Sequence, residues 1–518
     1  MASAPATKRH HDALVIGSQL GGLVAAALLA KRGHRVLVVD HDGLGEGYHD
    51  GGYTLPYAPV LLPPLKSIPA AESAFGELGM LTDLGRLLTP HDPELQVLLP
   101  GHRFDLSRDA ARRGRELSRE FADAKAADAA WSALGAVADQ AEPFLKGEPP
   151  FPATGFFDRW KEKRRANADA GLQKALAATP PEGHPLAAVA RGLTGFLSYR
   201  DGAPLQGLAV SRALALWLRG PQRISGGREA LRGLMHKRIR ELGSEVLGSE
   251  RAAIVEELQI AGSRVSGVKL VGDEGVHVGR AVISATDAGA LRRLVPPQAR
   301  KKKLAEQLDA VRLKRFLLAV NIVLPAEQLP AGLAPLGVLA PADEELGLIV
   351  YEVSNAVRHD ASAKKARPES GEAKAARPGS GGASPAPTTD QRVVCAAALV
   401  PAQARDLGDE HLDGLATRVR EAMLGVLPFA RPSLVSVPQL AKGAQRGSRL
   451  QLHPLFEIDE PPFLGITGLS LDTPMKNLFL ASREVLPGLG LEGELLAGLR
   501  VASKVQALLK KKDPLAGP

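Results

Sequence analysis

One stretch constrains the fold of this chain more than any other: Asp12 to Asp40, which reads DALVIGSQLGGLVAAALLAKRGHRVLVVD. It opens with a short apolar run, Ala13 to Ile16, and continues through a glycine-containing turn into an Ala- and Leu-rich segment, about Leu23 to Lys31. Gly33 ends that segment, and a second apolar run, Val36 to Val39, precedes the final carboxylate. This order predicts a buried strand, a tight turn, a helix and a second buried strand in immediate succession.

The turn is typical of dinucleotide-binding units, in which backbone N–H groups and a helix N-terminus face a pyrophosphate. In the G-x-G-x-x-G register, Gly17 and Gly22 hold the first and third positions. Gln19 holds the second, where the backbone must approach the phosphates closely. Asp40 lies about twenty residues further on, where a carboxylate accepts hydrogen bonds from a ribose. The candidate cofactor-binding residues of this stretch are Gly17, Ser18, Gln19, Gly21, Gly22 and Asp40.

The same stretch has a competing interpretation as a signal peptide or membrane helix. Lys8 and Arg9 precede a largely apolar run from Ala13 to Ala30. The run contains three glycines and a Gln, lacks a polar region with a small-residue cleavage signature, and leads at once into a second strand. These features favour the dinucleotide-binding unit.

Composition narrows the remaining classes. With 518 residues, 45% hydrophobic and 24% charged, the chain has the make-up of a soluble globular protein of about two to four domains. Its single cysteine, Cys395, excludes an intramolecular disulfide and argues against a cysteine-built metal site, and it fits a cytoplasmic location. No metal site is predicted.

The net charge of +8 is spread along the chain, with local clusters at 8–11, 300–303 and 510–512. These clusters are expected to be solvated surface groups. The alternative is that they attract the protein weakly to an anionic membrane. Aromatic residues make up only 4% of the chain and no basic stripe interleaves with them, so nucleic-acid binding is not expected.

Further along the chain, the pattern predicts a hairpin at residues 95–106 and helix at residues 108–145. Trp160 and His184 belong to no recognisable motif, so we assign them structural roles. Ser225 opens a helix that Gly243 ends, and three strand-like segments follow, the last at 276–284. Strands are also expected at 311–324, 346–353 and 392–400, with helices at about 410–427 and 494–509. Residues 359–390 are rich in Ala, Pro, Gly, Ser and Lys, which predicts a disordered insertion.

Four stretches together resemble the phytoene desaturase-like branch of the FAD-dependent amine oxidase superfamily. They are the Asp12–Asp40 unit, DGGYTLPYAPVLLPP, ISGGREALRGLMHKRIRELGSEV with its continuation to DAGAL, and NLFLASREVLPGLGLEGELLAGLRVASKV. The resemblance implies an α/β fold with a discontinuous Rossmann-like FAD-binding domain (1–90, 220–300 and 465–512). It also implies an α+β substrate domain (91–219 and 301–464) with a mixed or antiparallel sheet that covers an apolar tunnel.

The resemblance also assigns a cofactor and further site residues. FAD would lie between the N-terminal turn and the C-terminal motif, whose glycines allow close approach to a ring system and whose helix, beginning near Glu494, points its N-terminus at it. The implied contacts from this motif are Ser482, Arg483, Gly488, Gly490, Leu491 and Gly493. No catalytic acid or base is identified, because in this superfamily the flavin carries the chemistry.

Three positions depart from the family pattern, and all three concern the same ligand. Gln19 replaces the second glycine, Tyr53 follows Gly51-Gly52 where the family has Gly-Gly-Arg, and Ser482-Arg483 stands where the family has Gly-Asp. Arg483 or Gln19 would have to bind phosphate to offset these changes, which otherwise cost about 1–3 kcal/mol per unmet group.

Two functions follow from the resemblance. The first is an FAD-dependent oxidoreductase, such as a desaturase, dehydrogenase or isomerase, acting on a hydrophobic, isoprenoid- or carotenoid-like small molecule. Such enzymes often work at a membrane surface, so peripheral membrane contact is one of its implications. The alternative is a flavin-free relative that binds a lipid or protein partner, as the Rab GDP-dissociation inhibitors of this superfamily do. A nicotinamide-dependent enzyme fits less well, because it leaves the C-terminal motif without a role.

Overall fold

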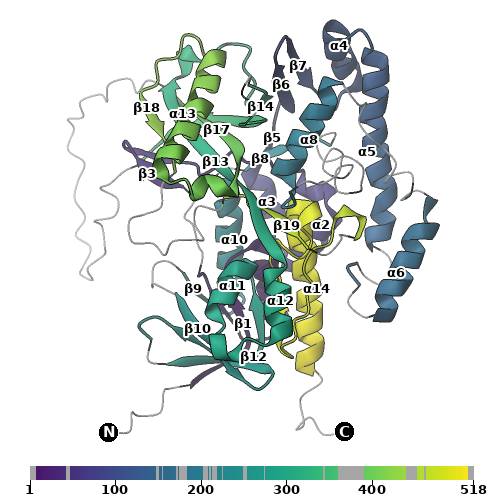
Figure 1. The fold of residues 1–518 in the computed structure, drawn as a ribbon, viewed down its shortest axis with the longest axis vertical. Coiled ribbons are helices and arrows are strands. Elements are labelled where there is room, and N and C mark those ends of the chain that lie inside the picture. Colours follow the sequence, from purple (N-terminus) through teal and green to yellow (C-terminus); the bar gives the residue numbers. More distant parts are fainter. Residues whose placement is uncertain are drawn as a thin grey trace, which may run out of the picture.

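In the residues that it describes, the computed structural model contains two large β-sheets, each with helices against it (Figure 1), and two small sheets, β16-β4-β3 and β5-β8. The structure describes residues 8–41, 47–146, 151–153, 156–170, 173, 184–201, 208, 212, 219–224, 226–248, 254–273, 275–341, 343, 345–359, 390–438, 452–459 and 463–510. In Figure 1 the sheet that begins with the N-terminal strand lies at the bottom, the second sheet lies at the top, and a group of helices flanks both on the right.

The first sheet is built from three separate parts of the chain. Its strand order is β10-β11-β12-β1-β2-β9, and β20 also pairs with β12. The strands β20, β12, β1, β2 and β9 run parallel, as expected of strands linked by helical crossovers. The bounds are β1 (Lys8–Ile16), β2 (Val36–Val39), β9 (Glu245–Leu247), β10 (Val255–Ala261), β11 (Arg264–Leu270), β12 (Val276–Ser284) and β20 (Leu478–Leu480).

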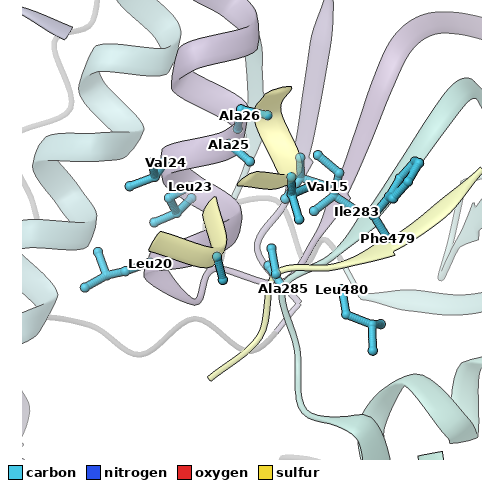
Figure 2. Close-up of a cluster of buried hydrophobic side chains, with 14 of the residues drawn as sticks. Val15, Leu20, Leu23, Val24, Ala25, Ala26, Ile283, Ala285, Phe479 and Leu480 are labelled. Carbon is cyan, nitrogen blue, oxygen red and sulfur yellow. The ribbon is translucent and has the colours of Figure 1, made fainter. Parts of the chain in front are cut away.

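The helix α1 (Leu20–Lys31) is buried on every side, from Leu20 to Ala30, because it lies between the first sheet and α14 (Gly490–Lys510). Small residues allow this close packing: a Cβ atom at Gly498 would come within 2.4 Å of the Gly21 carbonyl oxygen. Figure 2 shows Val15, Ile283 and Phe479 beside one another to the right of this helix, one from each of the parallel strands β1, β12 and β20.

The second sheet has the order β18-β13-β17-β15-β14-β6-β7, with β19 also paired to β13. Its pairs are antiparallel except β14 with β6. Residues of β13 alternate between a core beneath α8 and a core beneath α13, as the two-residue period of a strand requires. The bounds are β6 (Leu95–Leu99), β7 (His102–Leu106), β13 (Val311–Pro325), β14 (Leu336–Leu339), β15 (Ile349–Asn355), β17 (Gln391–Pro401), β18 (Leu434–Ser436), β19 (Leu455–Ile458), α8 (Pro185–Leu197) and α13 (Asp409–Val426).

The remaining elements connect or flank the sheets. The strands are β3 (Tyr48–Asp50), β4 (Tyr53–Leu55), β5 (Leu88–Pro90), β8 (Gln222–Ile224) and β16 (Val357–Arg358). The helices are α2 (Pro69–Leu78), α3 (Leu81–Leu87), α4 (Ala110–Glu120), α5 (Ala124–Lys146), α6 (Phe156–Ala168), α10 (Gly227–Glu241), α11 (Ala288–Leu294) and α12 (Lys302–Asp309).

The predicted fold class is confirmed: a discontinuous Rossmann-like unit accompanies a second domain whose sheet is mixed. Two boundaries are corrected. The helix α1 begins at Leu20 rather than Leu23, because the turn before it is shorter than expected, and α14 begins at Gly490, a full turn before Glu494. Ser225 and nearly all of the predicted disordered insertion, residues 360–389, lie outside the described residues.

Candidate functional site

A cavity of about 200 Å³ lies at the carboxyl ends of the parallel strands, between the first sheet and the second. Ligands of open α/β sheets bind at this edge, where the loops leave the strands. One wall is polar and formed largely by the first domain, and the other is apolar. The lining residues are Ser18, Gln19, Leu20, Pro56, Tyr57, Ala58, Pro59, Val60, Leu61, Phe196, Tyr199, Gly226, Gly227, Arg228, Glu229, Arg232, Asp287, Leu317, Leu452, His453, Arg483 and Glu494.

The two unusual residues of the sequence motifs, Gln19 and Arg483, contact each other. The Gln19 side chain accepts a hydrogen bond from the Arg483 backbone N–H at 2.8 Å and donates one to Asp287 Oδ1 at 2.6 Å. The Arg483 guanidinium pairs with the same Asp287 oxygen at 3.1 Å. These residues follow β1, β20 and β12, so side chains close the edge of the sheet where the family pattern predicts a close approach to phosphate.

Glu494, in the second turn of α14, extends its carboxylate to the N-terminus of α1. One carboxylate oxygen accepts a hydrogen bond from the Leu20 backbone N–H at 3.2 Å. The other accepts one from the Tyr199 hydroxyl and lies 3.9 Å from the Arg228 guanidinium, which also donates to Tyr199. Burial raises the pKa of Tyr199 to about 12, so this hydroxyl stays protonated and acts as a donor. A carboxylate of the chain therefore occupies the helix end that attracts phosphate in dinucleotide-binding folds.

Asp40, the predicted ribose ligand, is also engaged by the chain itself. It accepts a hydrogen bond from the Ser18 hydroxyl and forms an ion pair with Arg232 at 3.1 Å. Arg232 in turn pairs with Glu229 at 2.6 Å. Burial raises the pKa of Glu229 to about 7, although Arg232 acts in the opposite direction.

The residues in this arrangement do not fit a resident FAD. Three guanidinium groups line the cavity (Arg228, Arg232 and Arg483), and they face three carboxyl groups (Glu229, Asp287 and Glu494). The charges are nearly balanced, so the two phosphates of a dinucleotide would bring uncompensated negative charge into a partly desolvated site. The cavity of about 200 Å³ is also below the roughly 300–1,000 Å³ of typical ligand sites.

The glycines of the N-terminal turn have a structural explanation in their protein contacts. A Cβ atom at Gly17 would lie 2.4 Å from the Ala285 carbonyl oxygen, and Gly17 has a positive φ of 91°. A Cβ atom at Gly21 would meet the Ala481 carbonyl oxygen at 2.4 Å. At Gly22 it would overlap the Ala285 side chain. These glycines allow the turn to pack against β12, β20 and α14.

The C-terminal motif is buried against protein in the same way. A Cβ atom at Gly488 would lie 2.2 Å from the Gly465 carbonyl oxygen, and one at Gly493 would lie 2.2 Å from that of Leu486. Gly490 has a positive φ of 53°, and its Cβ would lie 1.8 Å from the Leu197 carbonyl oxygen. Leu491 and Ser482 are buried, and the Ser482 hydroxyl donates to Glu484 at 3.1 Å.

Of the twelve residues predicted to bind a cofactor, three line the cavity: Ser18, Gln19 and Arg483. The sequence reasoning missed Tyr199, Arg228, Arg232, Asp287 and Glu494. For two of these residues the sequence contained a clue. Arg228 and Arg232 are four residues apart at the start of a helix and therefore share a face. Nothing in the sequence around Tyr199 links it to a helix almost three hundred residues away.

A buried carboxyl group beside the cavity predicts a dependence of stability on pH. Glu484 accepts hydrogen bonds from the Ala288 backbone N–H at 2.7 Å and from Ser482. Burial and the nearby Asp287 carboxylate raise its pKa from 4.5 to about 8. The folded state therefore holds a proton that the unfolded chain releases near pH 4.5, so stability should fall as the pH rises toward 8.

The substitution Glu484→Gln, which keeps an acceptor for Ala288 but cannot ionise, should remove much of this fall. We expect the variant to exceed the wild type in free energy of unfolding by more than about 1 kcal/mol at pH 8 and to differ less at pH 5. Urea unfolding at both pH values measures this difference. An unchanged pH profile in the variant would show that Glu484 is ionised in both states.

The structure shows neither a metal centre nor a membrane span in the part of the chain it describes. No group of three or more His, Cys, Asp or Glu side chains there is arranged to hold a metal ion. No described helix has the length and apolar character needed to cross a bilayer, and the Ala13–Ala30 run forms part of β1 and the helix α1 instead.

Comparison with known proteins is consistent with this architecture. Residues 15–78 match the family model for an NAD(P)-binding Rossmann-like domain. No curated protein matches the sequence. Among solved structures, the chain is similar to cyclohexylamine oxidase from Brevibacterium oxydans, with 14% identity, a TM-score of 0.55, and 98% of this chain and 100% of that chain covered.

Two further structures give the same result. Putrescine oxidase bound to putrescine has 15% identity and a TM-score of 0.52, with 96% of this chain and 100% of that chain covered. An oxidoreductase from Methanosarcina mazei has 14% identity and a TM-score of 0.53, with 95% and 100% covered. At such identities the similarity concerns the fold alone, so this chain carries, over nearly its whole length, the fold of these oxidases and oxidoreductases.

Proposed function

We propose that this chain is a flavin-free relative of the amine oxidase fold that binds a small uncharged molecule with a large apolar part. The observation that carries the proposal is the Glu494 carboxylate at the N-terminus of α1. A carboxylate and a phosphate compete for the same N–H group, and Glu494 is held in place by Tyr199 and Arg228. The groups that would bind a dinucleotide are thus used to join the two domains.

The walls of the cavity support this ligand class. The apolar side is formed by Leu61, Phe196, Leu317 and Leu452, which would bury hydrocarbon. The polar side carries balanced ion pairs, so it offers hydrogen bonds to a hydroxyl or carbonyl group but has little net attraction for a charged one. A lipid alcohol or an isoprenoid alcohol has these properties.

A second candidate is the FAD-dependent oxidoreductase that the sequence resemblance implies, with a hydrophobic, isoprenoid- or carotenoid-like substrate. One observation favours it: β1, β12, β20 and the start of α14 all converge on a cavity that has an apolar wall. The fold shared with cyclohexylamine oxidase and putrescine oxidase agrees with this candidate. It requires the Glu494 and Arg483 contacts to open before the cofactor enters.

Absorbance and thermal unfolding distinguish the two candidates. We expect purified protein to be colourless between 350 and 500 nm, and its melting temperature to stay unchanged on titration with FAD but to rise with farnesol, since only a ligand of the native state stabilises it. A yellow protein, or a rise with FAD and none with farnesol, would contradict the proposal and favour the oxidoreductase.

A cavity-filling variant locates the ligand. Ala58 lines the cavity and is partly buried, so Ala58→Phe should abolish the farnesol response. Ala356 is partly buried to a similar degree but does not line the cavity, so Ala356→Phe should retain the response. Equal losses in the two variants would place the ligand elsewhere.

A further inference from the structure

The helix α6 presents an unusual combination of exposed aromatic and basic side chains. Phe157 is 75% exposed and Trp160 is 55% exposed, although aromatic residues of this size are normally buried. Lys161 and Arg164 are also exposed, and the spacing of the four residues places them on one face of the helix. We refer to Phe157, Trp160, Lys161 and Arg164 as the α6 surface.

The opposite side of α6 is firmly attached to the protein. Glu162 is buried and accepts a hydrogen bond from the Ala153 backbone N–H at 3.0 Å. Arg165 donates to the Phe144 carbonyl oxygen at 2.7 Å, and its guanidinium lies 4.5 Å from the centre of the Phe144 ring. Ala166 is buried as well. The helix lies at the right-hand edge of the molecule in Figure 1. Because its other side is held by these contacts, the α6 surface is exposed to solvent.

Most of the exposed charges on this helix are positive. Between residues 157 and 164 the exposed cations are Arg159, Lys161, Lys163 and Arg164, and the exposed anion is Asp158. Glu162, the other acidic residue of the segment, is turned inward. The Arg164 guanidinium lies 5.6 Å from the centre of the Trp160 ring, so cationic and aromatic groups share the same patch.

We propose that the α6 surface docks this protein onto an anionic lipid bilayer. Trp and Phe rings partition into the interfacial zone of a membrane, whereas Lys and Arg are attracted to anionic headgroups and reach them with long side chains. Phe157 and Trp160 lie one turn apart with Lys161 and Arg164 beside them, so one helix face combines the aromatic and the electrostatic contributions to membrane binding. A nucleic acid would contact the cations but would gain less from an exposed Phe. An acidic protein partner would also need the cations, so the same variants test for it.

Vesicle co-sedimentation of the full chain tests the proposal. We expect binding to vesicles of equal parts phosphatidylcholine and phosphatidylglycerol to be at least about tenfold tighter than to phosphatidylcholine alone, and to weaken as salt is added. Phe157→Ser with Trp160→Ser should weaken binding at least about tenfold. Lys161→Glu with Arg164→Glu should do the same, because each basic residue contributes about fivefold near an anionic surface.

Two controls distinguish binding through the α6 surface from nonspecific binding to vesicles. Phe429 is 83% exposed elsewhere on the protein, and Lys302 is an exposed cation of α12, so Phe429→Ser and Lys302→Glu should leave binding unchanged. Trp160→Phe should keep binding but lose the blue shift of tryptophan emission that vesicles cause in the wild type. Equal binding to neutral and anionic vesicles, or equal losses in the Phe429 control, would overturn the proposal.

Discussion

Replacing Gly490 with alanine is expected to lower the free energy of unfolding by about 3 kcal/mol in protein that holds no flavin. Gly490 has φ of 53° and ψ of −125°, a region that residues with a Cβ rarely adopt. A Cβ there would also lie 1.8 Å from the Leu197 carbonyl oxygen, so the backbone would have to shift. Urea unfolding of the purified variant measures the loss.

The matched control is Gly414→Ala. Gly414 lies in the exposed part of α13, and no neighbouring atom lies within 4 Å of the position that a Cβ would take. Alanine should therefore raise stability by about 0.5–1 kcal/mol through helix propensity. If Gly490→Ala proved as stable as the wild type, the motif would not be required for the packing of α14. Its glycines would then be explained by a ligand, as the sequence resemblance implies.

Replacing Glu494 with glutamine should destabilise the protein by about 2 kcal/mol. The substitution removes the charge that faces Arg228 and weakens the hydrogen bonds from Tyr199 and Leu20. Removing one partner of a fully buried ion pair costs about 3–5 kcal/mol, but the Arg228 side chain is 30% exposed, so a smaller loss is expected here.

Glu457→Gln is the appropriate comparison for this second variant. Glu457 pairs with Lys314 at 3.1 Å on the surface, and such pairs contribute less than about 1 kcal/mol. A loss in Glu494→Gln no larger than in Glu457→Gln would mean that the Glu494 network does not hold the domains together. That result would also weaken the proposal that the dinucleotide groups have been reused for this purpose.

Two of the three departures from the family pattern, Gln19 and Arg483, compensate each other in the structure. Gln19 adds a side chain where a cofactor phosphate would approach, and the Arg483 backbone and the Asp287 carboxylate satisfy that side chain. Arg483 reverses a charge, and the same Asp287 neutralises it. Each substitution taken alone disrupts a binding motif. Together, Gln19, Arg483 and Asp287 satisfy one another's hydrogen bonds and charges.

The membrane surface proposed for α6 lies in a segment about which the sequence is uninformative. No motif surrounds Trp160, so the sequence predicts only a structural role for it. Its exposure is decided by the attachment of Glu162, Arg165 and Ala166 on the other side of the helix. Which face of a helix points outward follows from the contacts that the helix makes with the rest of the fold.

Local patterns along the sequence were sufficient to predict the Rossmann-like unit. The apolar run Val36–Val39, the glycine turn and the Ala-rich helix depend on neighbours within a few residues, and each appears in the structure close to its predicted bounds. The same holds for the hairpin at 95–106 and for β12.

The contacts that fill the candidate site depend on the tertiary structure. Glu494 reaches Leu20, Tyr199 reaches Glu494, and Arg483 reaches Gln19 across sequence separations of 474, 295 and 464 residues. Such contacts arise only when the first, middle and last parts of the chain assemble into one sheet edge, and no local propensity encodes them. The sequence by itself determined that this chain has a glycine turn of the Rossmann type, and only the folded chain showed which of its own side chains occupy that turn.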